Sequence, residues 1–149
     1  MSGSGVIATV PTGTNGAGRY PTSGDNFWNT STSLVVTLSA PVAAFGFYGV
    51  DIGDFNGQVT VTTDSTFYNV GNTLNGLGGA VLFWGVIDTA NPFSTITFGN
   101  TNSGTDVFGF DQMTVGDVQQ VVAPFPEPST WTLLGSALAG ICFLRRRMS

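Results

Sequence analysis

The side chains best suited to chemistry in this 149-residue chain are aspartates in a glycine-rich stretch. Asp51, Asp54 and Asn56 lie within a few residues of one another, and Asp111 lies in a later predicted strand. Carboxylate and amide oxygens in such a loop can hold Ca²⁺, although the spacing is not that of an EF-hand and no bidentate glutamate follows. The pattern leaves two interpretations: a calcium site, or turn-forming aspartates that accept hydrogen bonds from nearby backbone N–H groups.

Several kinds of catalytic site are excluded by what the sequence lacks. The chain has no histidine, and its one cysteine is Cys142. Ser-His-Asp and Cys-His catalysis and histidine-ligated zinc are therefore excluded. A carboxylate-pair hydrolase needs two acids facing a cleft, and no glutamate precedes Glu127. We expect a protein that is not an enzyme and needs no cofactor, with Ca²⁺ as the one candidate ion.

The charge of the chain is divided unequally along its length. Residues 1–126 carry eight aspartates and a single cation, Arg19, which is a formal charge of −7. A surface with one cation cannot neutralise a row of phosphates, so nucleic-acid binding is excluded. The remaining three cations are Arg145, Arg146 and Arg147 at the end of the chain. This asymmetry indicates an appended segment with a separate role.

Aromatic side chains are the other candidates for binding. Exposed rings can stack on sugars, and the candidates are Tyr20, Trp28, Tyr48, Phe55 and Tyr68. Aromatics at strand spacing more often belong to a core. Both interpretations stay open from the sequence.

Short apolar runs separated by turn signals must position these side chains. The predicted strands are residues 34–38, 44–50, 58–62, 67–70, 80–87, 95–98 and 107–115. They predict an all-β domain of about seven or eight strands, a β-sandwich or jelly roll, over residues 27–117. Residues 80–87 are nearly all apolar, which predicts a central strand buried on both faces. Phe45-Gly46-Phe47 and Phe108-Gly109-Phe110 are interpreted as two core strands, each with a glycine between inward aromatics.

The sandwich is flanked by segments of different composition. Residues 1–26 are rich in Gly, Ser and Thr, and within them only residues 6–10 have the pattern of a strand. Residues 118–128 form a linker containing Pro124, Pro126 and Pro128. Residues 129–144 contain no charge, and as a helix they would span about 24 Å. We therefore expect a single transmembrane helix and its basic stop over residues 129–149. The expected anchor residues are Trp131, Leu133, Leu134, Leu138, Ile141, Phe143 and Leu144.

The order of these tail features resembles a known sorting signal. Pro126-Glu127-Pro128, an apolar stretch and a terminal arginine run are similar to the PEP-CTERM signal. The resemblance implies export by a Gram-negative bacterium, recognition of Pro126, Glu127 and Pro128 by the membrane protease exosortase, and release or transfer to the cell surface. Arg145, Arg146 and Arg147 match the cytoplasmic stop, which the positive-inside rule also predicts. The body would then lie outside the cytoplasm, anchored in the inner membrane until processing.

The body also resembles, loosely, the secreted β-sandwich domains that precede this tail, through residues 44–47, 83–88 and 108–111. Such proteins begin with a signal peptide, and residues 1–26 have neither a basic nor an apolar region of that kind. We therefore expect the chain to be truncated at its N-terminus. Two functions follow: a non-enzymatic surface or matrix protein of biofilms, or a carbohydrate-binding module acting in exopolysaccharide, with or without Ca²⁺.

Overall fold

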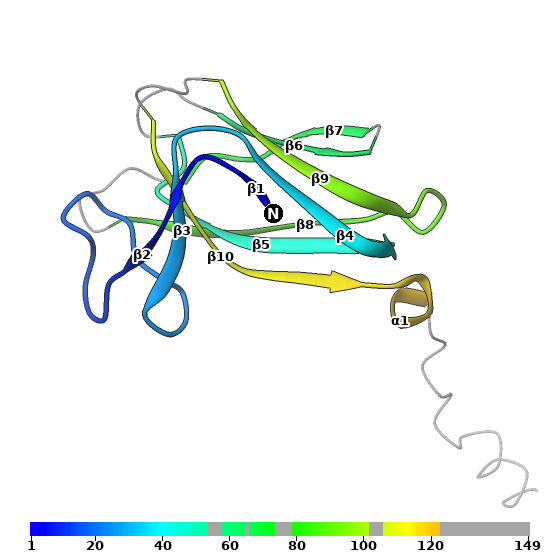
Figure 1. The fold of residues 1–149 in the computed structure, drawn as a ribbon, viewed down its shortest axis with the longest axis horizontal. Coiled ribbons are helices and arrows are strands. Elements are labelled where there is room, and N and C mark those ends of the chain that lie inside the picture. Colours follow the sequence, from blue (N-terminus) through cyan, green and yellow to red (C-terminus); the bar gives the residue numbers. More distant parts are fainter. Residues whose placement is uncertain (54–57, 65, 74–78, 102–105, 123–149) are drawn as a thin grey trace, which may run out of the picture.

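The computed structural model describes residues 1–53, 58–64, 66–73, 79–101 and 106–122. Within these residues, ten strands form two antiparallel five-stranded sheets that pack as a sandwich, followed by one short helix (Figure 1). The predicted all-β sandwich is confirmed, with ten strands in place of seven or eight. Residues 129–149, for which a transmembrane helix was expected, lie outside the described part. In the part that is described, no helix has the length and apolarity to cross a membrane.

Each sheet has a simple order of neighbours. The first sheet contains, across its width, β1 (Ser2–Gly3), β4 (Leu34–Val42), β9 (Phe93–Asn100), β6 (Val59–Thr63) and β7 (Thr66–Asn69). The second contains β2 (Val6–Thr9), β3 (Asn26–Thr30), β10 (Phe108–Gly116), β5 (Ala44–Val50) and β8 (Val81–Ile87). Both sheets therefore draw an outer strand from residues 1–26, a segment that the sequence set apart from the sandwich.

The core between the sheets follows from alternation along the strands. In β6, Val59 and Val61 are fully buried whereas Thr60 between them is partly exposed, as a period of two requires. Phe47 of β5 and Phe98 of β9 meet across the core with ring centroids 5.0 Å apart. Such edge-to-face pairs add stability beyond the area they bury.

The two Phe-Gly-Phe segments have the predicted inward orientation. Phe45, Phe47, Phe108 and Phe110 all belong to the buried core cluster. The glycine between each pair faces outward, where an aromatic ring from the neighbouring strand lies close to it. The interpretation as two core strands of similar shape is confirmed.

The prediction for residues 80–87 was wrong about their place in the sheet. β8 is an edge strand, paired with β5 on one side. Its residues alternate between exposed and partly buried. Phe83 and Ile87 are 59 % and 68 % exposed. The apolar run does not mark burial on two faces, because the outer row of β8 has no described element packed over it.

A helix begins where the sequence predicted an extended linker. Helix α1 (Val118–Val122) follows β10 directly (Figure 1). The Asp117 carboxylate accepts a hydrogen bond from the backbone N–H of Gln120, and the Gln120 side chain accepts one from the backbone N–H of Asp117. This reciprocal pair is a capping box, which satisfies two donors at the start of the helix.

Candidate functional site

The aspartates singled out in the sequence lie near the end of β5 and in the first half of β10. Asp51 directly follows β5, and Asp111 in β10 pairs with Tyr48 of β5. Asp54 and Asn56, the other two candidate calcium ligands, lie outside the described residues. Within the described ranges, no three His, Cys, Asp or Glu side chains are grouped as metal ligands. The calcium site stays a prediction.

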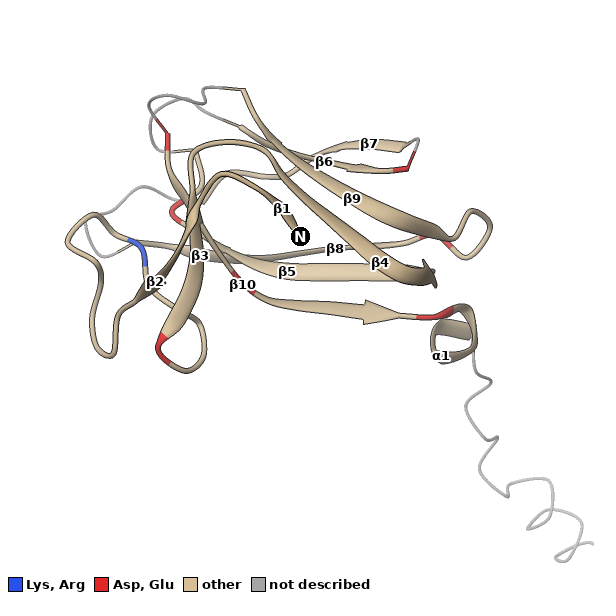
Figure 2. Ribbon diagram, in the orientation of Figure 1, with Lys and Arg blue, Asp and Glu red and all other residues tan. Residues whose placement is uncertain are grey.

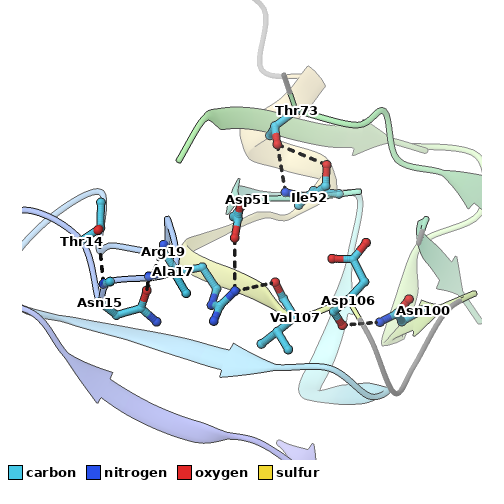
Figure 3. A network of polar contacts seen from close by, with 11 residues as sticks. Thr14, Asn15, Ala17, Arg19, Asp51, Ile52, Thr73, Asn100, Asp106 and Val107 are labelled. Atoms are coloured by element: carbon cyan, nitrogen blue, oxygen red, sulfur yellow. Dashed lines mark hydrogen bonds and ion pairs between the residues drawn. The ribbon is translucent and has the colours of Figure 1, made fainter. Parts of the chain in front are cut away.

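Asp51 forms a buried ion pair with the single cation of the body. The Arg19 Nη1 atom lies 3.1 Å from the Asp51 Oδ2 atom, and the two side chains are 13 % and 5 % exposed (Figure 3). The same Nη1 atom donates a hydrogen bond to the carbonyl oxygen of Val107, 3.2 Å away. Asp51 has a φ of 62°, a left-handed conformation that aspartate tolerates better than most residues. The pair joins the loop before β3 to the ends of β5 and β10.

A compact loop holds Arg19 in place. The Asn15 Oδ1 atom accepts hydrogen bonds from the backbone N–H groups of Ala17 and Arg19, at 3.0 and 3.2 Å. Gly18 between them has a φ of +88°, and a Cβ there would lie 3.1 Å from the Asp51 carboxylate. A glycine is therefore required both for the backbone and for the approach of the carboxylate.

Asp111 fixes the same loop at a second point. Its Oδ2 atom accepts hydrogen bonds from the backbone N–H and the hydroxyl of Thr22 and from the backbone N–H of Ser23, at 2.8 to 3.0 Å. Its Oδ1 atom accepts one from the backbone N–H of Gln112. These contacts are those of an aspartate that shapes a loop.

Other polar contacts at this end were not anticipated from the sequence. Asp106 is fully buried, and its carbonyl oxygen accepts a hydrogen bond from the Asn100 side chain at 2.9 Å (Figure 3). The hydroxyl of Thr73 accepts a hydrogen bond from the Ile52 backbone N–H at 2.9 Å. Turn residues with no periodic pattern make these contacts, so no signal in the sequence marks them.

Charge is spread over the ends and turns of the sandwich. Figure 2 shows the acidic residues at turns and strand ends, while long stretches of both sheets carry no charge. The part of the chain that the structure describes contains one basic residue, Arg19, which is already paired. The described residues therefore offer an anionic ligand no further lysine or arginine.

The candidate sugar-stacking aromatics are dispersed. Tyr20 lies in the loop before β3, Trp28 lies in β3, and Tyr68 in β7 packs on Trp84 of β8. Phe55 lies outside the described residues. Tyr48 of β5 packs against Phe83 of β8, with ring centroids 5.1 Å apart. Phe83, which was predicted to be buried, is the more exposed ring of this pair.

An apolar depression adjoins Phe83 on the outer face of the second sheet. It has a volume of about 650 Å³ and runs from Phe83 across β5 to α1. Three glycines and Ala44 contribute small residues to its lining. The remaining lining includes Phe83, Ile87, Thr114, Gln120 and Val121. The surface is concave here because the three glycines, which have no side chains, lie between the Phe83 ring and helix α1.

The comparisons with known proteins give a clear match for the tail and none of comparable strength for the body. Residues 126–147 match the model of the PEP-CTERM protein-sorting motif. The search of the curated proteins found no match. Among solved structures, one of TmCBM61 in complex with β-1,4-galactotriose is similar at 17 % identity, over 64 % of this chain and 73 % of that chain, with a TM-score of 0.38. A likeness at this level supports no argument about the ligand of the body.

Proposed function

Because the chain carries the PEP-CTERM protein-sorting motif at residues 126–147, we propose that it is a non-enzymatic surface or extracellular-matrix protein of a Gram-negative bacterium. The motif implies an exported protein that is sorted through an exosortase. In our proposal Pro126, Glu127 and Pro128 are the recognition sequence. The apolar residues from Trp131 to Leu144 anchor the chain in the inner membrane until cleavage releases the body to the surface or the matrix.

The structure of the body supports a role without catalysis. Asp51 is engaged by a buried arginine, and Asp111 accepts hydrogen bonds that fix a loop. An acid or base in catalysis needs access to a substrate and a pKa suited to proton transfer. The β-sandwich instead offers broad uncharged faces, which suit a protein that acts by contact.

The sorting proposal is tested by changing the motif alone. We expect replacement of Pro126, Glu127 and Pro128 by alanine to leave the full-length chain uncleaved in the inner membrane. The matched control replaces Gln119, Gln120 and Val121 by alanine, which changes the same number of residues a few positions earlier in the chain. Pulse-chase labelling followed by membrane fractionation measures the precursor. Processing at the wild-type rate in the motif variant would contradict the proposal.

A carbohydrate-binding body is the second candidate. The observation that favours it is the exposed Phe83 ring beside Thr114 and Gln120 in the apolar depression, since sugar sites combine an aromatic platform with a few polar groups. Affinity electrophoresis in soluble polysaccharide should then show retardation that Phe83→Ala abolishes and Ile7→Ala retains. Loss of retardation on adding a chelator would show that the binding requires Ca²⁺. Equal mobility of all variants would remove this candidate.

A further inference from the structure

Exposed apolar side chains gather beside helix α1, on the outer face of the second sheet. Phe83, Ile87 and Val115 line the apolar depression and are 59, 68 and 47 % exposed. We call these three residues the apolar patch. Val122, the last residue of α1, is also exposed. Several exposed apolar side chains on one face mark a candidate interaction surface.

The chain leaves the described part of the sandwich next to this patch. Helix α1 forms one wall of the depression through Gln120 and Val121, and it ends at Val122 (Figure 1). The uncharged stretch of the sorting tail begins seven residues later, at Ser129. Seven residues span at most about 25 Å when fully extended. In an anchored precursor, the helix that forms this wall therefore stays within about 25 Å of the start of the membrane segment.

From this geometry we infer that the apolar patch lies against the surface of the bilayer in the anchored precursor, with zwitterionic lipid as its partner. The inference rests on the membrane anchor of the proposed function. A tether this short gives the patch a high effective concentration at the surface, so a contact too weak to hold a free body on lipid suffices. Apolar side chains at such a surface contact the boundary between headgroups and acyl chains.

The shape and charge of the depression favour lipid as its occupant. Three glycines make the surface concave, and flexible lipid chains can fill a hollow that a rigid flat surface leaves empty. The described residues that line it carry no charge, so contact with lipid transfers no charged group out of water. Acidic groups follow β8 at Asp88 and begin α1 at Asp117. Together with the formal charge of −7 on residues 1–126, they disfavour anionic lipid.

Two other exposed apolar residues lie on different faces and supply controls. Phe67 of β7 is 60 % exposed. Its neighbour Tyr68 packs inward on Trp84 of the other sheet, so Phe67 points to the outer face of the first sheet. Ile7 is 61 % exposed on β2, at the border of the second sheet opposite β8. Neither residue lines the depression beside α1. The inference therefore predicts lipid contact at the apolar patch and not at these two positions.

Fluorescence quenching by labelled lipid tests the contact in the full chain. In a Cys142→Ser background, Ile87→Cys, Val115→Cys or Phe67→Cys carries a single NBD fluorophore. Each chain is reconstituted in phosphatidylcholine nanodiscs that contain a doxyl-labelled lipid. We expect quenching at positions 87 and 115 to be at least threefold greater than at position 67. Adding phosphatidylglycerol to the discs should lower the quenching at positions 87 and 115, because anionic headgroups repel the acidic body.

Two charge variants and a label on the tail supply the matched comparisons. Adding Ile87→Glu to the chain labelled at position 115 should lower its quenching at least threefold, because a carboxylate resists transfer out of water. Ile7→Glu, at a residue of similar exposure on the opposite border of the sheet, should leave the quenching unchanged. In the wild-type chain, NBD on Cys142 reports the anchoring of the tail separately. Far-ultraviolet circular dichroism checks that each variant is folded.

The outcomes separate this inference from the sorting proposal. Quenching at positions 87 and 115 no greater than at position 67, with the Cys142 label quenched, would overturn the inference and leave the membrane anchor in place. An unquenched Cys142 label would contradict the anchor and the inference together. Equal quenching with and without Ile87→Glu, or equal or stronger quenching with phosphatidylglycerol, would also overturn the inference. An unquenched patch whose Ile87→Glu variant loses polysaccharide retardation would assign this face to a glycan instead.

Discussion

At the scale of single residues, the acidic side chains of the body act as structural connectors. Asp51 and Asp111 bind two neighbouring points of the loop that precedes β3, the first through Arg19 and the second through Thr22 and Ser23. Asp51 directly follows β5, and Asp111 lies in the neighbouring strand β10. The loop is thereby fixed over one end of the second sheet, while the other end of that sheet bears the apolar depression.

Removal of the arginine should be costly because it leaves a buried carboxylate without its cation. We expect Arg19→Met to lower the free energy of unfolding by about 3 kcal/mol, in the range for breaking buried ion pairs. Arg19→Lys keeps the charge but loses the planar fork, so it should cost less. Urea unfolding followed by tryptophan fluorescence measures both variants. A loss below about 1 kcal/mol for Arg19→Met would show that the pair is not buried as described.

The hydrogen bonds of Asp111 can be tested by proteolysis. Arg19 is the single site for trypsin before residue 145, so cleavage there reports opening of one loop. We expect Asp111→Ala to increase the cleavage rate after Arg19 several-fold, because three hydrogen bonds to Thr22 and Ser23 are lost. Asp88→Ala, which changes a turn elsewhere, is the control. Equal cleavage rates for the two variants would contradict the assigned role.

At the scale of elements, the two Phe-Gly-Phe strands share a motif but differ in their surroundings. Gly109 of β10 lies under Phe27 of β3, which is buried. Gly46 of β5 lies under Phe83 of β8, which is exposed. The same Phe-Gly-Phe pattern therefore has a buried ring over its glycine in β10 and an exposed ring over its glycine in β5. The open position is the one that lines the apolar depression, which contains both Gly46 and Phe83.

The two glycines should respond differently to the same substitution. At Gly109 a Cβ would lie 3.1 Å from the ring of Phe27, which is buried. We expect Gly109→Ala to destabilise the protein by about 2 kcal/mol through overpacking. At Gly46 the exposed Phe83 ring can turn outward, so Gly46→Ala should cost less than about 1 kcal/mol. Thermal unfolding compares the pair, and a larger loss for Gly46→Ala would contradict this account of the two faces.

At the scale of the whole molecule, body and tail have opposite charges and separate roles. Residues 1–126 carry a formal charge of −7, with their single arginine buried in an ion pair. The tail carries three arginines after an uncharged stretch and contains the sorting motif. The cations of the chain therefore serve either internal structure or the tail, and the outer faces of the sandwich are left uncharged over long stretches (Figure 2).

The terminal arginines should determine how firmly the precursor is held. Replacing Arg145, Arg146 and Arg147 by serine removes the charges that the positive-inside rule keeps on the cytoplasmic side. We expect the fraction of precursor recovered with the inner membrane to fall several-fold, with the PEP sequence unchanged. Replacing Ser129, Thr130 and Thr132 by alanine is the control, since it adds no charge. Unchanged recovery of the arginine variant would show that the apolar stretch suffices.

The sequence alone predicted the class of fold and the tail because both depend on local patterns. The alternation at Val59-Thr60-Val61, the inward pairs Phe45/Phe47 and Phe108/Phe110 and the sorting motif were all recognisable from spacing and residue type. The strand-like run at residues 6–10 corresponds to β2, whereas β1, β3 and the Asp117–Gln120 capping box were missed. Their sequence patterns are short, and some lie in segments rich in glycine and serine, where alternation is hard to recognise.

Only the tertiary structure decided where each strand lies and what each aspartate does. An apolar strand in the centre of a sheet and one at its edge have the same local pattern, so Val81–Ile87 could not be recognised as an edge before its neighbours were known. Arg19 and Asp51 are far apart in sequence, and their pairing depends on the loop that brings them together. Local periodicity determines which residues form strands, whereas burial and pairing depend on contacts between distant segments.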